Sequence, residues 1–369
     1  MQGVNTRFPV GIVGYGAYIP TARLLTTEID MHRGATPGTG EKSLGVISKS
    51  VPNLDEDAAT LAVEAAQQAV DRVAAAVKMN IKKKVKTTKS EQDIGAVFVG
   101  SESHPYAVKP TGTIVAQALG LSENISLADL EFACKAGTQA LQIGAAYVAS
   151  GMCKQVLAVG TDTAQSQPGD ALEYTAGAGA AAFIVGCENV LVEIIDTASI
   201  ATDTPDFWRG ALNSYPSHAG RFSAQPAYFA HLTKSVTLLL EKTKLSPKDI
   251  DYCVFHTPNY NFPVSIAKKL GFTQAQLAPS LLVDTVGNTY SAASLLALVK
   301  LLDEAEADKT ILLASYGSGA GSDAFLLKTT KALITQRKLW RNTIAHQLKT
   351  TKHISYGEYQ KRMEFIKPL

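Results

Sequence analysis

The feature of this sequence that most limits its fold is an internal repeat with a constant offset of 154 residues. At this offset Cys134 falls on Asn288, and Glu102 falls on His256. The β-like runs around them fall together as well, 96–101 with 251–255, 155–160 with 309–314 and, after an extra loop, 177–183 with 317–325. A constant offset over this length predicts a duplicated unit, with two related halves that face each other.

Each half alternates short apolar runs with amphipathic helical runs, which is typical of an α/β protein with mixed, mainly parallel sheets. Expected strands are 10–13, 96–100, 156–160, 180–185, 252–256, 311–314 and 324–327. Expected helices are 57–77, 137–150, 228–243 and 291–304. We divide the chain into an N-terminal half (1–190), a C-terminal half (191–330) and a basic extension (331–369).

Composition argues against several classes of protein. A net charge of +2 on 369 residues gives no general attraction to nucleic acid or to a membrane surface. The basic run 82–86 and the basic segment after Leu327 are interpreted as solvated surfaces. Four scattered cysteines predict neither disulfides nor a zinc site, and we expect no signal peptide and no membrane span. We therefore expect a cytoplasmic protein with reduced thiols.

Four polar residues follow expected strands or begin expected helices. In α/β sheets, ligands bind beyond the carboxyl ends of strands, which predicts that Glu102, Cys134, His256 and Asn288 share one site. Cys134 begins a helix of small residues, where unsatisfied N–H groups and the helix dipole lower a thiol pKa and can hold an oxyanion. A small buried core residue is the alternative for Cys134.

The other three residues also have two interpretations each. Glu102 is either a partly desolvated base or an exposed loop residue. His256 either polarises a carbonyl or is a satisfied core histidine, and Asn288 is either a site residue or a helix N-cap. The Gly-rich turn 315–319 offers backbone N–H groups for an oxyanion hole, and no Lys-Ser/Thr pair follows it, which excludes a phosphate loop. Together, these groups predict carbon–carbon bond formation on thioesters.

Six runs that carry these residues resemble the hydroxymethylglutaryl-CoA synthase family, in its shorter archaeal form. They are 100–103 (GSES), 131–137 (EFACKAG), 204–209 (TPDFWR), 255–259 (FHTPN), 287–291 (GNTYS) and 315–319 (SYGSG). The resemblance implies a thiolase-like fold, layered α-β-α-β-α, and the condensation of acetyl-CoA with acetoacetyl-CoA in the mevalonate pathway of isoprenoid biosynthesis. It implies no cofactor and no metal, only CoA thioester substrates.

The resemblance also implies a role for each matching residue. Cys134 would carry the acetyl group, Glu102 would move the proton of its methyl group, and His256 would hydrogen-bond the acceptor. Backbone N–H groups of Cys134 and Ser318 would form the oxyanion hole. Other matching positions, which would contact the substrate, are Asn288, Thr175 and Ser223.

One part of the family pattern is missing. Asn261 and Ser265 stand where the family has basic residues for the CoA phosphates, so Lys268 and Lys269 are the substitutes that we expect. The resemblance further implies a homodimer and a complex with acetoacetyl-CoA thiolase and a small OB-fold protein, for which the basic C-terminal segment is a candidate docking site.

Three other functions share part of this pattern of residues. A ketoacyl synthase of the chain-starting type uses Cys, His and Asn at similar spacing, but decarboxylation forms its carbanion and needs no base such as Glu102. A thiolase would need a second cysteine near the last Gly-rich turn, and 315–323 contain none. A non-catalytic acyl-CoA-binding scaffold is the remaining alternative, although every catalytic position is filled.

Overall fold

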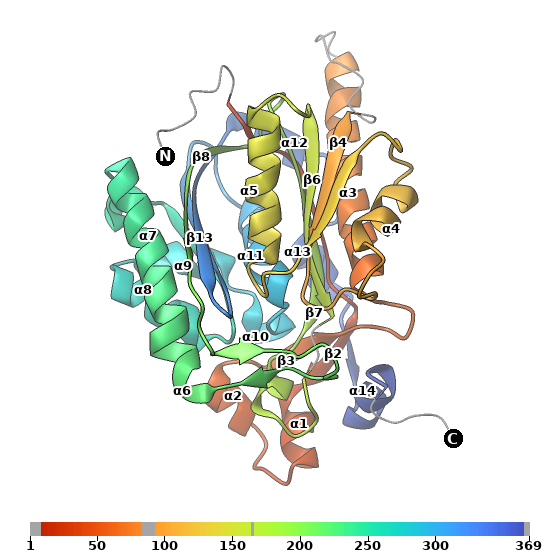
Figure 1. Cartoon of the computed structure of the whole chain (residues 1–369), viewed down its shortest axis with the longest axis vertical. Helices are drawn as coiled ribbons and strands as arrows, with labels where there is room; N and C mark the ends of the chain where they lie inside the picture. The colour runs from red at the N-terminus through yellow and green to blue at the C-terminus, as the bar shows by residue number, and fades with distance from the viewer. Residues whose placement is uncertain (1–8, 83–92, 164–165, 365–369) are drawn as a thin grey trace.

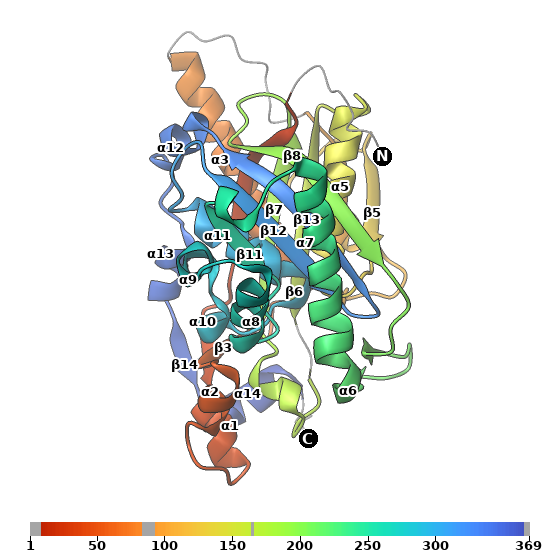
Figure 2. The ribbon, with the colours of Figure 1, turned by 90° about the vertical axis from the view of Figure 1, so that its left-hand side faces the viewer.

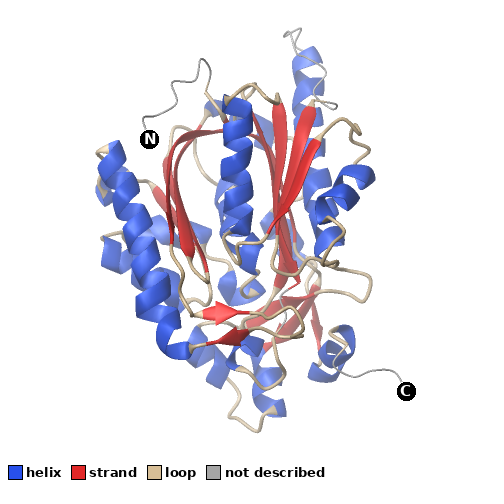
Figure 3. Cartoon of the chain, viewed as in Figure 1, coloured by secondary structure: helices blue, strands red, loops and turns tan. Residues whose placement is uncertain are grey.

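The computed structural model describes residues 9–82, 93–163 and 166–364, and it has five layers in the order helix, sheet, helix, sheet, helix (Figures 1 and 3). Nine strands of the described residues form one sheet that divides into two half-sheets. The division lies where β1 and β8 pair at only two positions, Gly11 with Glu193 and Ile12 with Val192. This is the thiolase-like fold that the motifs predicted.

The two half-sheets repeat the same strand order. The first runs β1 (Gly11–Tyr18), β7 (Ala178–Gly186), β6 (Gln155–Thr163), β4 (Ile94–Gly100) and β5 (Ser126–Leu130). The second runs β8 (Val192–Ala201), β13 (Gly321–Thr329), β12 (Thr310–Gly317) and β11 (Tyr252–Phe255). Strand directions match pair by pair, and the predicted duplication is confirmed in the topology.

Strand pairing is mixed, and parallel pairs are limited to the outer strands of each half-sheet. β4 pairs in parallel with β5 and β6, and β11 pairs in parallel with β12, whereas the inner pairs are antiparallel. The sheet is mixed, as predicted, and its antiparallel pairs are the inner ones. A strand that is buried on both faces is apolar throughout, whether it runs parallel or antiparallel to its neighbours. The sequence pattern therefore does not distinguish parallel from antiparallel pairing.

Two helices lie between the half-sheets, α5 (Ala136–Ala149) and α11 (Ala293–Leu302) (Figure 1). Almost every residue of α11 is buried, as expected for a helix that contacts apolar layers on opposite sides. α3 (Ala58–Lys82) and α4 (Thr111–Ala118) cover the outer face of the first half-sheet. α7 (Ala230–Thr243) and α8 (Asn261–Leu270) lie over the second, as Figure 2 shows.

The residues before Cys134 and Asn288 both have a positive φ. Ala133 has φ +43°, in the left-handed region, and Gly287 has φ +79° with ψ −172°. A non-glycine residue in this region costs energy, so the turn before Cys134 is held under strain by its surroundings. The two turns therefore lie at equivalent positions of the 154-residue repeat.

The central layer depends on glycines where α5 meets its neighbours. A Cβ on Gly137 would lie 2.6 Å from the backbone oxygen of Ser291 and 2.9 Å from the Cα of Gly160. Backbone atoms cannot rotate away, so we expect Gly137→Ala to lower the free energy of unfolding by about 1–3 kcal/mol, the usual range for overpacking. Urea denaturation measures this. Gly357→Ala, where nothing lies within 4 Å, is the control and should leave stability unchanged or raise it.

The C-terminal segment does not extend away from the body. α12 (Lys331–Arg337) and α13 (Ile344–Lys349) lead to β14 (Lys352–Ile354), which pairs in parallel with β2 (Ala22–Leu25) of the N-terminal half. α14 (Tyr356–Arg362) follows and buries Tyr356 and Tyr359. The interpretation of this segment as a mainly solvated surface is therefore wrong for these two side chains. The basic run 82–86 lies largely outside the described residues.

The remaining strands and α-helices of the described residues are short. They are β3 (Ser48–Val51), which pairs with β2, and β9 (Phe207–Trp208), which pairs with β10 (Ser217–His218), together with α1 (Thr26–His32), α2 (Thr39–Leu44), α6 (Gly220–Phe222), α9 (Gln274–Leu277) and α10 (Val283–Val286). Within the described residues, no helix combines the length and apolar character that crossing a bilayer requires.

Candidate active site

The residues that the sequence pointed to come together where strands of the two half-sheets end. A cavity of about 250 Å³ opens there, with a mainly apolar lining. Six of the expected site residues line it: Cys134, Thr175, Ser223, His256, Asn288 and Ser318. Phe207, Tyr228, Phe262 and Tyr290 supply aromatic walls. Such a lining suits a thin, largely apolar chain with a few polar groups.

Cys134 lies between β5 and α5, in the turn that the strained Ala133 forms. Its Sγ donates a hydrogen bond to Glu102 Oε1 at 3.2 Å. Burial raises the thiol pKa well above its ordinary value, and the neighbouring Glu102 charge raises it further. The predicted lowering of this pKa by the helix N-terminus is therefore wrong, because desolvation and nearby carboxylates outweigh the dipole. Forming the thiolate requires a base, and Glu102 is in contact.

Glu102 follows β4 and sits beside a second cavity, of about 610 Å³. Burial raises the pKa of this carboxyl to about 8, and the charge of Asp162 adds to the effect. A carboxyl of this kind can both take and return a proton near neutral pH. The second cavity is more polar and shares Phe207, Tyr290 and Ser318 with the first. Cys134 lines the apolar cavity and Glu102 lines the polar one, so this hydrogen-bonded pair lies where the two cavities meet.

Asp162, which the sequence reasoning missed, holds the Glu102 turn in place. Its Oδ1 accepts hydrogen bonds from the Glu102 amide at 2.9 Å and from the hydroxyls of Ser101 and Ser103. Its Oδ2 accepts the amide of Ser291, in the other half of the chain, at 2.7 Å. Asp162 lies at the carboxyl end of β6, so the rule that selected Glu102 and His256 would have selected it too.

His256 follows β11 and is buried. Burial lowers the pKa of the imidazole to about 3, so the ring is neutral at physiological pH. Nδ1 has no hydrogen-bond partner among the described residues, and the main-chain oxygen of His256 accepts the hydroxyl of Tyr228 at 2.7 Å. A neutral imidazole facing a cavity can hydrogen-bond a carbonyl oxygen without placing a full charge beside it.

Asn288 lies in the turn of the second half that matches Cys134. Its Oδ1 accepts the amide of Tyr290 at 2.9 Å, and its side chain lines the cavity. Its main-chain amide donates to the main-chain oxygen of Thr175 at 2.7 Å. The N-cap of the short helix that follows, η6 (Tyr290–Ala292), is Thr289, so the geometry favours a site residue over a helix cap for Asn288.

Asp206 is a second residue that the sequence reasoning did not select, although it stands within the quoted 204–209 run. It accepts the amide of Gly319 at 2.8 Å and the hydroxyl of Tyr316. Both contacts go to the Gly-rich turn 315–319 that carries Ser318. Asp206 thus holds this turn in its position relative to Cys134.

The two expected CoA contacts lie elsewhere. Lys268 and Lys269 are in the last turn of α8 and are exposed. Neither lines one of the two cavities described above, whereas Phe262, in the first turn of α8, does. Contact of these lysines with CoA phosphates stays a prediction.

The raised pKa of Glu102 predicts a pH dependence. Its carboxylate form is needed to remove a proton, so we expect the rate of condensation to rise with pH and to level off above about pH 8. Asp162→Asn removes a negative charge that raises this pKa, so the rise should move to lower pH. Initial rates between pH 6 and pH 9 measure both. A flat profile in the unmodified protein would contradict the role of Glu102 as the base.

The same pKa shift has a consequence for stability. The folded state holds the Glu102 proton more tightly than the unfolded state does between pH 4.5 and about 8. Its contribution to the free energy of unfolding therefore falls as pH rises through this window.

Comparison with known proteins gives the family. The 3-oxoacyl-[acyl-carrier-protein] synthase III model matches residues 128–203, and the model of its C-terminal part matches residues 240–329. A structure of HMG-CoA synthase complexed with CoA superposes with a TM-score of 0.84 at 24% identity, over 96% of this chain and 90% of that chain. The Curacin biosynthetic pathway HMG synthase superposes at 0.83 and 22%, over 96% and 88%.

Much higher identities are found among archaeal proteins. Hydroxymethylglutaryl-CoA synthase of Archaeoglobus fulgidus is 48% identical, over 97% of this chain and 99% of that protein. The enzyme of Methanopyrus kandleri is 49% identical, over 97% of this chain and 98% of that protein. On this full-length similarity and the thiolase-like fold, the chain belongs to the hydroxymethylglutaryl-CoA synthase family.

Proposed function

We propose that this protein condenses acetyl-CoA with acetoacetyl-CoA, through an acetyl thioester on Cys134, to give 3-hydroxy-3-methylglutaryl-CoA and free CoA. The reaction is the acyl transfer of the mevalonate pathway. The observation that carries the proposal is the 3.2 Å contact between Cys134 Sγ and Glu102 Oε1, at the junction of the two cavities. It pairs a nucleophile that needs a base with a carboxyl whose pKa is near 8.

In the first step, the sulfur of Cys134 attacks the carbonyl carbon of acetyl-CoA. The thiol proton passes to Glu102 and from there to the departing sulfur of CoA, which leaves Glu102 as a carboxylate for the next step. Backbone N–H groups of Cys134 and Ser318 hold the negative charge on the carbonyl oxygen. The carboxyl and the thiol are already hydrogen-bonded, so the transfer needs no rearrangement of the pair.

In the second step, Glu102 removes a proton from the methyl group of the acetyl-enzyme. The resulting carbanion equivalent attacks the ketone carbon of acetoacetyl-CoA. His256, neutral because its pKa is about 3, hydrogen-bonds the ketone oxygen, and Asn288 helps to orient it. Glu102 returns its proton to the new alkoxide. Thr175 and Ser223 contact the acceptor along the cavity wall.

In the last step, water attacks the thioester that still joins the product to Cys134. The acid product leaves with the hydroxyl of water, and the cysteine thiol is restored. The polar cavity beside Glu102 is the side from which water reaches this bond. CoA contributes no catalytic group of its own, and Lys268 and Lys269 remain our candidates for its phosphates.

A ketoacyl synthase of the chain-starting type is the second candidate, because two of its domain models match this chain. Product analysis separates the two functions. With ¹³C-labelled acetyl-CoA and unlabelled acetoacetyl-CoA, we expect labelled 3-hydroxy-3-methylglutaryl-CoA by mass spectrometry. Formation of acetoacetyl product from a malonyl thioester, with release of carbon dioxide and no six-carbon acid, would instead favour the ketoacyl synthase.

We also propose a homodimer, supported by the exposed edge of β5, which pairs only with β4 in the described sheet. A complex with acetoacetyl-CoA thiolase and a small OB-fold protein is part of the same proposal.

The four cysteines are free, which supports a reducing, cytoplasmic location. In this assignment residues 1–190 carry the nucleophile and base, residues 191–330 carry His256 and Asn288, and residues 331–369 form the extension.

A further inference from the structure

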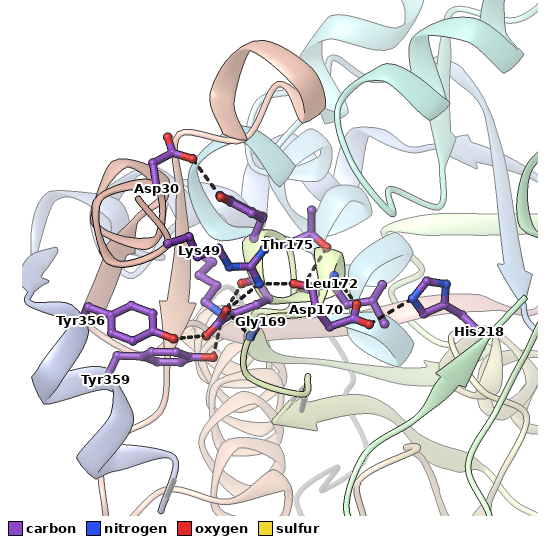
Figure 4. A network of polar contacts seen from close by, with 12 residues as sticks. Asp30, Lys49, Gly169, Asp170, Leu172, Thr175, His218, Tyr356 and Tyr359 are labelled. Atoms are coloured by element: carbon purple, nitrogen blue, oxygen red, sulfur yellow. Dashed lines mark hydrogen bonds and ion pairs between the residues drawn. The ribbon is translucent and has the colours of Figure 1, made fainter. Parts of the chain in front are cut away.

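A buried carboxylate outside the reaction chemistry, Glu173, accepts hydrogen bonds from separate segments of the chain. Figure 4 shows Gly169, Lys49 and Tyr356, which lie around it. Its side chain is fully buried. One oxygen accepts from Arg33 Nη2 at 2.8 Å and from the amide of Gly169 at 3.0 Å. The other accepts the hydroxyl of Tyr356, in the C-terminal segment, at 2.7 Å. The charge of Glu173 is thus satisfied by donors from three parts of the sequence.

A buried lysine holds the main chain at the same residue. Lys49, in β3, donates to the main-chain oxygen of Glu173 at 2.5 Å and to the hydroxyl of Tyr359 at 3.0 Å. It lies over the Tyr359 ring, 4.3 Å from the centroid. The side chain and backbone of Glu173 are therefore each tied to one tyrosine of α14.

The turn that Glu173 belongs to is part of the cavity wall. It is the short helix η2 (Ala171–Tyr174), preceded by Asp170 and followed by Thr175. Asp170 caps η2 through the amide of Leu172 at 2.8 Å and contacts His218 at 3.2 Å. Four of these residues line the apolar cavity: Ala171, Leu172, Thr175 and His218.

The network also reaches the second half of the site. The main-chain oxygen of Thr175 accepts the amide of Asn288 at 2.7 Å, and the amide of Gly177 donates to the oxygen of Asn288 at 2.9 Å. A shift of η2 would therefore move two cavity walls and Asn288 together. Apolar contacts alone tolerate small sliding movements, whereas directional hydrogen bonds to a buried charge do not.

We propose that Glu173 is a positioning residue for the thioester cavity, and that Tyr356 and Tyr359 make the C-terminal segment a structural part of the substrate site. This inference rests on the proposed function of the cavity. No member of the Glu173 network contacts Cys134 or Glu102 directly, so its effect is on how substrates bind. The extension after α13 is then required for substrate affinity, in addition to any role in docking a partner.

Tyr356→Phe tests the inference with little disturbance. It removes the hydroxyl that Glu173 accepts and leaves the ring stacked on His32, with centroids 3.9 Å apart. We expect KM for acetoacetyl-CoA to rise about tenfold, the equivalent of about 1.4 kcal/mol. The amount of Cys134 that becomes acetylated at saturating acetyl-CoA should not change.

The chain offers a matched control in Tyr18→Phe. The hydroxyl of Tyr18 also donates to a glutamate, Glu56, at 2.5 Å, and neither residue lines the two cavities. We expect both variants to lower Tm by a similar amount and only Tyr356→Phe to raise KM. If both leave KM unchanged, or both raise it equally, Glu173 is a stability element and the inference is overturned.

A second comparison separates failure of this inference from failure of the proposed function. Thr175→Ala should raise KM by itself, and combined with Tyr356→Phe it should raise KM less than the product of the two single effects. Independent, multiplying effects would overturn the inference while leaving the cavity assignment intact. If Thr175→Ala has no effect on KM, and the unmodified protein forms no acetyl-Cys134, the proposed function itself is wrong and this inference with it.

Discussion

In Cys134→Ala we expect no covalent acetyl adduct and a loss of condensation on the order of 10⁵-fold, the scale reached when a covalent nucleophile is deleted. The reason is that the acetyl group then has no sulfur to join, while the rest of the cavity stays in place. The experiment is incubation with acetyl-CoA alone, followed by digestion and mass spectrometry of the peptide that contains residue 134. The unmodified protein should show one acetyl thioester on this peptide.

Cys153→Ala is the control, because Cys153 is free and lies away from both cavities. Labelling and turnover should be close to those of the unmodified protein. An acetyl adduct on the Cys153, Cys187 or Cys253 peptide, or condensation at a normal rate in Cys134→Ala, would contradict the covalent mechanism.

Glu102→Ala should separate the two halves of the reaction. We expect condensation to fall by about 10²–10⁴-fold, the usual contribution of a general acid–base residue. Acetylation of Cys134 should be slower, because the thiol loses its base, but it should still be detectable. The charge of Glu102 raises the thiol pKa, so its removal offsets part of the loss. Rapid-quench labelling with acetyl-CoA and product analysis with acetoacetyl-CoA measure the two steps separately.

Glu131→Ala provides the comparison. It removes another carboxylate beside the polar cavity, and it should leave both steps largely unchanged because Glu131 forms no hydrogen bond to the thiol among the described residues. Normal condensation in Glu102→Ala would refute the synthase assignment. Loss of labelling together with loss of condensation would show instead that no thioester forms without Glu102 as the base.

The general plan of the fold was predictable because a duplicated chain repeats its pattern of strands and helices at a constant offset in the sequence. The 154-residue offset that pairs Cys134 with Asn288 corresponds to equivalent turns, with positive φ at Ala133 and Gly287. Buried strands were also predictable from their apolar runs. Every predicted strand falls within an observed strand or extends at most one residue beyond it. Strand direction was not predictable in the same way, because a strand buried on both faces is apolar in either direction.

The site was predictable where polar residues follow apolar strands, as at Glu102 and His256. Asp162 satisfies the same rule, because it follows the apolar run 156–160 by two residues, as Glu102 follows 96–100. Asp206 was different. Its importance comes from accepting the Gly319 amide, more than a hundred residues away in the chain, and nothing near it in the sequence indicates that contact.

The sequence by itself determined the duplicated α/β architecture, the family and the group of residues that share one cavity, because periodicity and motif order are local properties of the chain. Only the tertiary structure decided the protonation states of the residues that share this cavity. Burial and the charges of Glu102, Asp162 and Asp206 raise the pKa of Cys134, which the helix dipole alone would have lowered. It also decided that Tyr356 and Tyr359 reach Glu173 and Lys49 across the chain. Desolvation and long-range hydrogen bonds depend on which distant residues meet, and that information exists only once the chain has folded.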